Sequence, residues 1–187
     1  MLLPFLRRIR IGSLKPPVTP GSASWGYGTY SPVIPEYNTI TMEIWGAGGG
    51  SACASNGGTA PGAGGTSYFS APSGVIYAYG GQGGSPGDGE TAGAPGADGP
   101  ASGGDQNITG GGAAGGAWVY WNSYVGGKGG NGGYVRKTWI WGQAGSPVVG
   151  SAYTLVCNSG GAGGYYQFNN ALSGYAGSNA SARLTWS

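Results

Sequence analysis

Alternating apolar and polar residues predict a series of short β-strands. The clearest alternation spans residues 39–45, where Ile40, Met42 and Ile44 occupy one face of an extended chain. Thr41, Glu43 and Trp45 occupy the other face. Further strands are predicted within 25–45 and at 66–70, 75–79, 134–141, 153–157 and 181–187. No segment shows the 3.6-residue periodicity of an amphipathic α-helix. We therefore expect an all-β fold, a small β-sandwich-like sheet without α-helix.

Glycine-rich excursions separate these strands. The longest are residues 46–65 and 80–117, and Gly-Gly-X triplets recur at 126–134 and 160–165. A polyproline-II-type helix has three residues per turn, so these triplets would align every X on one stripe and leave two bare backbone faces. Such helices can pack side by side through backbone hydrogen bonds. We expect packed polyglycine-II-like helices, and long loops are the alternative.

The composition favours an ordered chain. Glycine supplies 45 of the 187 residues, which by itself is typical of low complexity. Aromatic residues, however, make up 12% and charged residues only 7%, the opposite of most disordered chains. Because each ordered glycine costs roughly 0.5–1 kcal/mol relative to alanine, so many are tolerable only where close backbone packing requires them.

Two regions are predicted, an extended arm with a Pro-rich linker at 1–24 and a glycine-rich β domain at 25–187. The basic residues of the arm follow its apolar ones, the reverse of a secretory signal. No apolar run is long enough for a membrane span. The alternation at 8–11 suits an edge strand added to a partner. The candidate anchoring residues are Leu3, Phe5, Leu6, Arg7, Arg8, Ile9, Arg10 and Ile11.

Side chains suited to catalysis are scarce. The chain has no histidine, the commonest general base and metal ligand. Four of the six carboxylates, Asp88, Glu90, Asp98 and Asp105, lie in one Gly/Pro excursion. Solvated loop acids are the favoured interpretation there, and a calcium site is the alternative. The net charge of +2 is too small for a nucleic-acid footprint. We expect no enzyme activity, cofactor or metal. Whether Cys53 and Cys157 pair is left open.

Aromatic side chains are the remaining candidates for recognition. Trp118, Tyr120, Trp121 and Tyr124 lie between two glycine runs, and Tyr165, Tyr166 and Phe168 follow another. Tyrosine and tryptophan combine apolar area with a polar handle, which suits sugar and protein surfaces. Core packing is the favoured alternative for 118–124. Trp45, Trp139, Trp141 and Trp186 fall in predicted strands, so we expect structural roles for them.

Several segments resemble the glycine-rich domain of bacteriophage tail proteins. Residues 34–50 resemble its opening strand, in which a Val-Pro step leads to Trp-Gly-Ala-Gly-Gly-Gly. Residues 65–70 with 76–84 are similar to its second segment, residues 132–164 to its third, and residues 182–187 to its final strand. The resemblance covers about 30–187 and departs from the family at the Pro-rich 93–101 and at Cys157-Asn158.

The resemblance implies a non-enzymatic virion structural protein, displayed at the virion surface as a tail fibre or tail-associated adhesin. Aromatic loops would contact a host glycan or outer-membrane protein. Other virion proteins would bind the arm, and a homo-oligomer is expected, with a trimer favoured by the resemblance. The alternative is a capsid or tail decoration protein that docks through its arm without binding a receptor.

Overall fold

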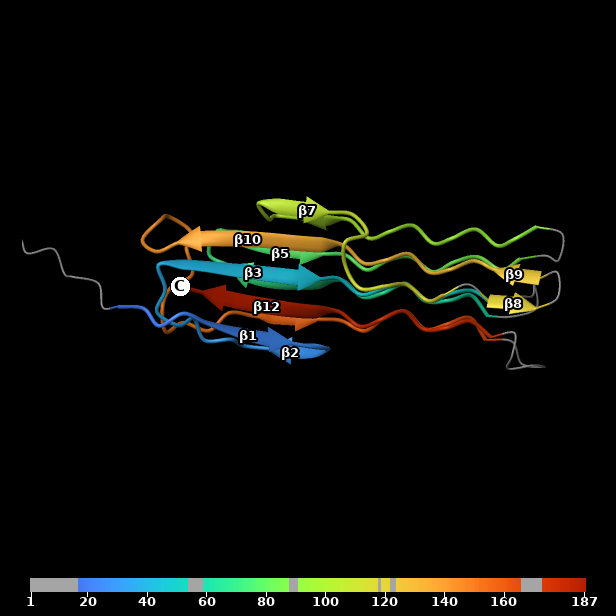
Figure 1. The fold of residues 1–187 in the computed structure, drawn as a ribbon, viewed down its shortest axis with the longest axis horizontal. Helices are drawn as coiled ribbons and strands as arrows, with labels where there is room; N and C mark the ends of the chain where they lie inside the picture. The colour runs from blue at the N-terminus through green and yellow to red at the C-terminus, as the bar shows by residue number, and fades with distance from the viewer. Residues whose placement is uncertain (1–16, 54–58, 88–90, 118, 122–123, 166–172) are drawn as a thin grey trace, which may run out of the picture.

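The computed structural model describes residues 17–187 except 54–58, 88–90, 118, 122–123 and 166–172. Two parts follow one another along the long axis of the molecule (Figure 1). A β-sandwich forms one half, and glycine-rich segments without regular strands extend from it. The anchoring candidates of the arm, at positions 3 and 5–11, lie outside the described residues.

Two five-stranded sheets make up the sandwich, and their strands pair antiparallel. The first sheet has the order β1 (Gly21–Trp25), β12 (Ser181–Trp186), β3 (Thr39–Trp45), β10 (Tyr134–Ile140), β7 (Gln106–Ile108). The second has the order β2 (Gly28–Tyr30), β11 (Leu155–Cys157), β4 (Ser67–Ala71), β5 (Gly74–Ala78), β6 (Ala101–Ser102). The described residues contain no α-helix, so the predicted all-β, sandwich-like fold is confirmed.

The hydrophobic core lies between the sheets. Ile40, Met42 and Ile44 of β3 are fully buried, as their alternation predicts. They belong to one cluster with Phe69 and Leu155 of the opposite sheet. Complete burial of side chains of this size stabilises the fold by about 1.5–3 kcal/mol each.

Three of the four tryptophans with predicted structural roles pack against neighbouring side chains. Trp139 is buried, meets Phe69 edge-on at 6.1 Å, and its Nε1–H donates to Ser73. Trp186 packs against the core, and half-buried Trp45 lies against Tyr134. The predicted strand position of Trp141 was wrong, because β10 ends one residue earlier, and half of the Trp141 surface is exposed.

Three strands lie in segments for which the sequence predicts a linker or a glycine excursion. β1 begins at Gly21, inside the predicted 1–24 arm and linker. β6 and β7 lie within the 80–117 excursion. β7 is exposed along its length and joins the sheet through backbone pairing with β10, so it needs no apolar alternation. Strands of this kind leave no hydrophobic pattern in the sequence.

Eight glycine-rich segments, called glycine helices here, run between the sandwich and the far end (Figure 1). They comprise residues 46–53, 59–65, 79–87, 91–100, 111–117, 126–133, 158–165 and 173–180. Along the chain, a segment that runs away from the sandwich, called outward, alternates with one that runs back to it, called returning. Helix 46–53 continues directly from β3, the central strand of the first sheet.

Helix 46–53 hydrogen-bonds to neighbours on all sides with a period of three. Its successive N–H groups bond three different helices: Gly48 donates to Ser178, Gly49 to Gly130 and Gly50 to Gly62. Three residues farther on, Ser51 donates again to the helix that contains Ser178, and Ala52 donates again to the helix that contains Gly130. Its carbonyls accept from three more helices, through Gly81 and Gly84, Ala113 and Gly116, and Gly161 and Gly164. Six neighbours therefore surround it, which confirms packed helices over long loops.

Glycine is required because the helices touch backbone to backbone. A Cβ on Gly50 would overlap the carbonyl oxygen of Ala162, and one on Gly129 would overlap that of Gly49. Larger residues occupy outward positions three apart, such as exposed Gln82 and Ser85. The interior of the bundle is thus largely main chain with a few small buried side chains such as Ala47 and Ser51, and the larger side chains form its surface stripes.

A carboxylate on the outer face of the first sheet links three strands. Glu43 lies opposite Arg136 of β10 and Arg183 of β12. Arg183 binds Glu43 Oε2 at 2.7 Å, and the Tyr134 hydroxyl donates to Oε1 at 2.7 Å. Partial burial opposes ionisation of Glu43, but these hydrogen bonds and the arginine charges outweigh it and lower its pKa. Burial and then the Glu43 hydrogen bond raise the pKa of Tyr134 to about 12.

Replacing Gly50 by alanine should destabilise the protein strongly. The added methyl group meets a fixed carbonyl, and such overpacking costs about 3 kcal/mol or more when backbone must shift. Gly26→Ala is the matched control, because nothing lies within 4 Å of a Cβ there. Chemical denaturation followed by circular dichroism measures both. Equal stability of the two variants would contradict the backbone-packed bundle.

Glu43→Gln should destabilise the protein in a pH-dependent way. The lowered pKa means that ionised Glu43 stabilises the fold above its unfolded pKa of about 4.3 and loses this effect as pH falls through its folded pKa. Because Arg183 is half exposed, we expect about 1 kcal/mol at pH 7. The difference from the parent should shrink toward pH 3 in urea denaturation. A difference that is constant with pH would refute the electrostatic explanation.

Candidate functional site

The end of the bundle farthest from the sandwich, called the distal end, brings together the far ends of the glycine helices (Figure 1). Described residues at these ends include buried Cys53 and Gly87, and exposed Thr59 and Tyr165. The hairpin of β8 (Val119–Trp121) and β9 (Tyr124–Gly126) lies at the same end. Several chain segments that are remote in sequence are therefore presented together.

The β8–β9 hairpin is rooted in the bundle. Its register pairs Val119 with Gly126 and Trp121 with Tyr124. Val119 is buried, and a Cβ on Gly126 would clash with the carbonyls of Ala52 and Cys53, at the end of helix 46–53. This packing holds the base of the hairpin against the most enclosed part of the bundle.

Tyr165 is exposed on a fixed backbone. Half of its surface is open to solvent. Its N–H donates to Thr59 Oγ1 at 2.8 Å, and its carbonyl accepts from the Thr59 N–H at 2.7 Å. Two hydrogen bonds from a neighbouring glycine helix therefore set the direction of this side chain.

Tyr175 is a second exposed aromatic residue, which the sequence analysis missed. It is 61% exposed. Buried Ser51 holds its backbone, because the Tyr175 N–H donates to Ser51 Oγ at 2.7 Å and its carbonyl accepts from the Ser51 N–H at 2.9 Å. The available signal was its place between Gly174 and Gly177, since a residue between inward glycines faces outward.

The other recognition candidates are only partly described. Trp118, Tyr166 and Phe168 lie outside the described residues. Tyr120, Trp121 and Tyr124 are described as hairpin backbone. Recognition by their side chains stays a prediction, as does the core-packing alternative.

Two of the described carboxylates, Asp98 and Asp105, stabilise local backbone. Asp98 accepts from the Asn131 N–H at 2.7 Å, joining two glycine helices. Asp105 accepts from the Thr138 N–H at 2.7 Å, beside β10. Asp88 and Glu90 lie outside the described residues. Across the described part of the chain, no three His, Cys, Asp or Glu residues gather as metal ligands.

Cys53 and Cys157 are both buried, and neither forms a disulfide. Helix 158–165 runs parallel to helix 46–53, with Gly161 bonded to Gly48 and Gly164 to Ser51. Cys157 is therefore level with about residue 44, and Cys53 lies on the order of 28 Å farther along at ~3.1 Å per residue. This distance excludes an intrachain disulfide. Burial raises the pKa of Cys157 to about 11.

Comparisons with known proteins do not add to this picture. Protein-family models, curated proteins and solved structures yield no match to the chain. Where the structure describes the chain, no helix combines the length and apolar character needed to cross a bilayer. Function is therefore inferred from the residues, their geometry and the resemblance in sequence.

The two thiols should be unreactive in the native protein. Cys157 is buried in the sandwich, and Cys53 is buried at the end of helix 46–53. Neither thiol is therefore accessible to a reagent in solution. With a chromogenic disulfide reagent at pH 8, we expect slow reaction of the native protein. Both thiols should react quickly in denaturant. Recovery of fewer than two thiols after unfolding without reductant would contradict two reduced cysteines.

Proposed function

We propose that the protein is a non-enzymatic structural component of a bacteriophage virion, a tail fibre or tail-associated adhesin that presents its distal end to the host surface. The observation that carries this proposal is the presentation of Tyr165 and Tyr175 on hydrogen-bonded backbone in the bundle that carries the β8–β9 hairpin. The resemblance of residues 30–187 to phage tail glycine-rich domains supports the same assignment.

The bundle has the properties of a spacer. In the described glycine helices around residues 46–53, backbone groups bond to neighbouring backbone and glycines meet backbone carbonyls. Each helix is held by several neighbours, which resists bending. A spacer of this kind keeps the distal residues away from the sandwich, where the chain would join the particle.

The distal end suits variable recognition. Loops on a rigid scaffold tolerate sequence change better than the elements that carry them. Here the described residues of the distal end are separated from the sandwich core by the length of the bundle (Figure 1). They can therefore change without disturbing the buried cluster that stabilises the fold.

The chemistry of the distal end points to sugars or a protein surface. Exposed tyrosines and tryptophans provide flat apolar area with a hydrogen-bonding group. Truncation of interface residues of these types causes the largest losses of binding free energy. The described residues around Tyr165 and Tyr175, at 159–165 and 173–180, include no charged side chain. Recognition here would therefore depend weakly on salt.

Trp121→Ala and Tyr165→Ala should each weaken binding to the host surface at least tenfold, the loss expected for aromatic anchor residues. Fluorescently labelled full-length protein would be titrated onto a panel of intact bacterial cells and onto immobilised bacterial glycans and outer-membrane proteins. Tyr27→Ala is the control, because Tyr27 is more exposed than Tyr165 but lies in the β1–β2 turn of the sandwich.

A correctly folded protein that binds no cell or glycan in the panel would argue against the adhesin role. It would favour the decoration-protein alternative, in which the arm docks on the particle without receptor binding. Equal loss in Tyr27→Ala would show that the binding is unspecific and does not involve the distal end.

A further inference from the structure

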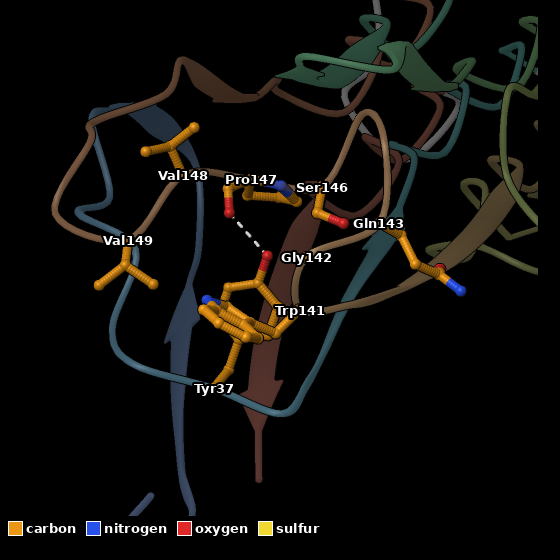
Figure 2. Close-up of a pocket in the computed structure, with 8 residues that line it drawn as sticks. All are labelled: Tyr37, Trp141, Gly142, Gln143, Ser146, Pro147, Val148 and Val149. Carbon is orange, nitrogen blue, oxygen red and sulfur yellow. Dashed lines mark hydrogen bonds between the residues drawn. The ribbon is translucent and has the colours of Figure 1, made fainter. Parts of the chain in front are cut away.

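An apolar groove crosses the end of the sandwich opposite the bundle, called the proximal end (Figure 2). Its volume is about 360 Å³. The lining residues are Tyr37, Trp141, Gly142, Gln143, Ser146, Pro147, Val148 and Val149. Trp141 and Val148 are each more than half exposed. Large apolar side chains gathered in a concave surface are typical of a binding site.

The groove is preformed. The buried Tyr37 side chain donates through its hydroxyl to the Pro147 carbonyl at 2.6 Å (Figure 2). The Trp141 N–H donates to the Asn38 carbonyl, and the Gly150 N–H donates to the Ile34 carbonyl, both at 2.9 Å. The loop 141–150 is thus held at both ends and in the middle, so a ligand would not have to order it.

The N-terminal arm departs from the same end. The Trp186 indole donates to the Thr19 carbonyl at 3.1 Å, just before β1 begins. The next residue, Ser187, accepts from the Asn38 N–H, and Asn38 in turn accepts from Trp141. Hydrogen bonds through Trp186, Ser187 and Asn38 therefore connect the base of the arm to Trp141 in the wall of the groove.

The arm has the complementary composition. Leu3, Phe5, Ile9 and Ile11 occupy odd-numbered positions, so an extended chain presents them on one side, with Arg7 between Phe5 and Ile9. The arm also carries Arg7, Arg8 and Arg10. Exposed Glu36 precedes Tyr37 of the groove, and it is the one charged residue in segments 31–39 and 141–153. The charges of the two surfaces are therefore opposite.

We propose that residues 1–11 of one copy occupy the proximal groove of a second copy. Pro16, Pro17 and Pro20 favour an extended linker, which opposes the sharp reversal needed to reach the copy's own groove. Reciprocal exchange of identical arms between identical grooves produces a closed oligomer. This inference does not depend on what the distal end binds.

The test compares oligomeric states by light scattering of the purified full-length chain at about 50 μM, where mass action favours association. The full-length protein should be oligomeric. A deletion of residues 1–11 and the groove variant Val148→Asp should both be monomeric and folded. Ile108→Asp, on the exposed edge strand β7, is the control and should remain oligomeric.

Mixing the two monomeric variants gives a second readout. The deletion variant retains its groove and the Val148→Asp variant retains its arm, so together they should form a heterodimer. In the full-length chain, Leu3→Cys combined with Val149→Cys should be joined by a bis-maleimide into covalent oligomers. Cys53 and Cys157 are buried and serve as the unreactive background.

Three results would overturn the proposal. A monomeric full-length protein would exclude exchange, and so would cross-linking confined to single chains. An oligomer that persists after deletion of residues 1–11 would show that another surface joins the copies. None of these outcomes alters the distal end, so failure here is distinguishable from failure of host-surface binding.

Discussion

Hydrogen bonding between main chains in three directions is the interaction on which the rest of this molecule depends. In a β-sheet each strand bonds to two neighbours within a plane, whereas helix 46–53 bonds to six neighbours around its axis. A buried peptide group without a partner costs about as much as a lost hydrogen bond. No glycine helix can satisfy its own groups, because this helix type has no internal bonds. The bundle therefore forms as a unit.

The sandwich supplies the hydrophobic core that the bundle lacks. Glycine buries little apolar area, so the hydrophobic stabilisation is concentrated in the cluster around β3 and the facing sheet. The sandwich also sets the register of the helices. The antiparallel pair Trp45–Tyr134 ends the β3–β10 ladder, and the next bond, from Gly46 to the Gly133 carbonyl at 2.7 Å, already belongs to the bundle.

This division leaves two ends of different character. The distal end carries Tyr165, Tyr175 and the β8–β9 hairpin on a chemically inert support. The proximal end carries the apolar groove and the departure point of the arm. The bundle thereby separates the exposed distal tyrosines from the proximal groove, so changes at either end can be tolerated without altering the other.

The sequence by itself determined the periodic features. Alternation at 39–45 identified the central strand and its buried face, and Gly-Gly-X triplets identified helices with three residues per turn. It also singled out Tyr165, because that residue directly follows a glycine run. These features are local, so they depend on the pattern of a single segment.

Only the tertiary structure decided the sheet order, the exposed strand β7, the presentation of Tyr175 and the groove at Trp141. Each joins segments that are far apart in the chain: Ser51 holds Tyr175, and Tyr37 holds the loop at Pro147. Backbone hydrogen bonds carry no side-chain signature. Which glycine helix lies beside which other one is therefore set by packing in three dimensions, and a chain of near-identical glycine triplets does not encode it locally.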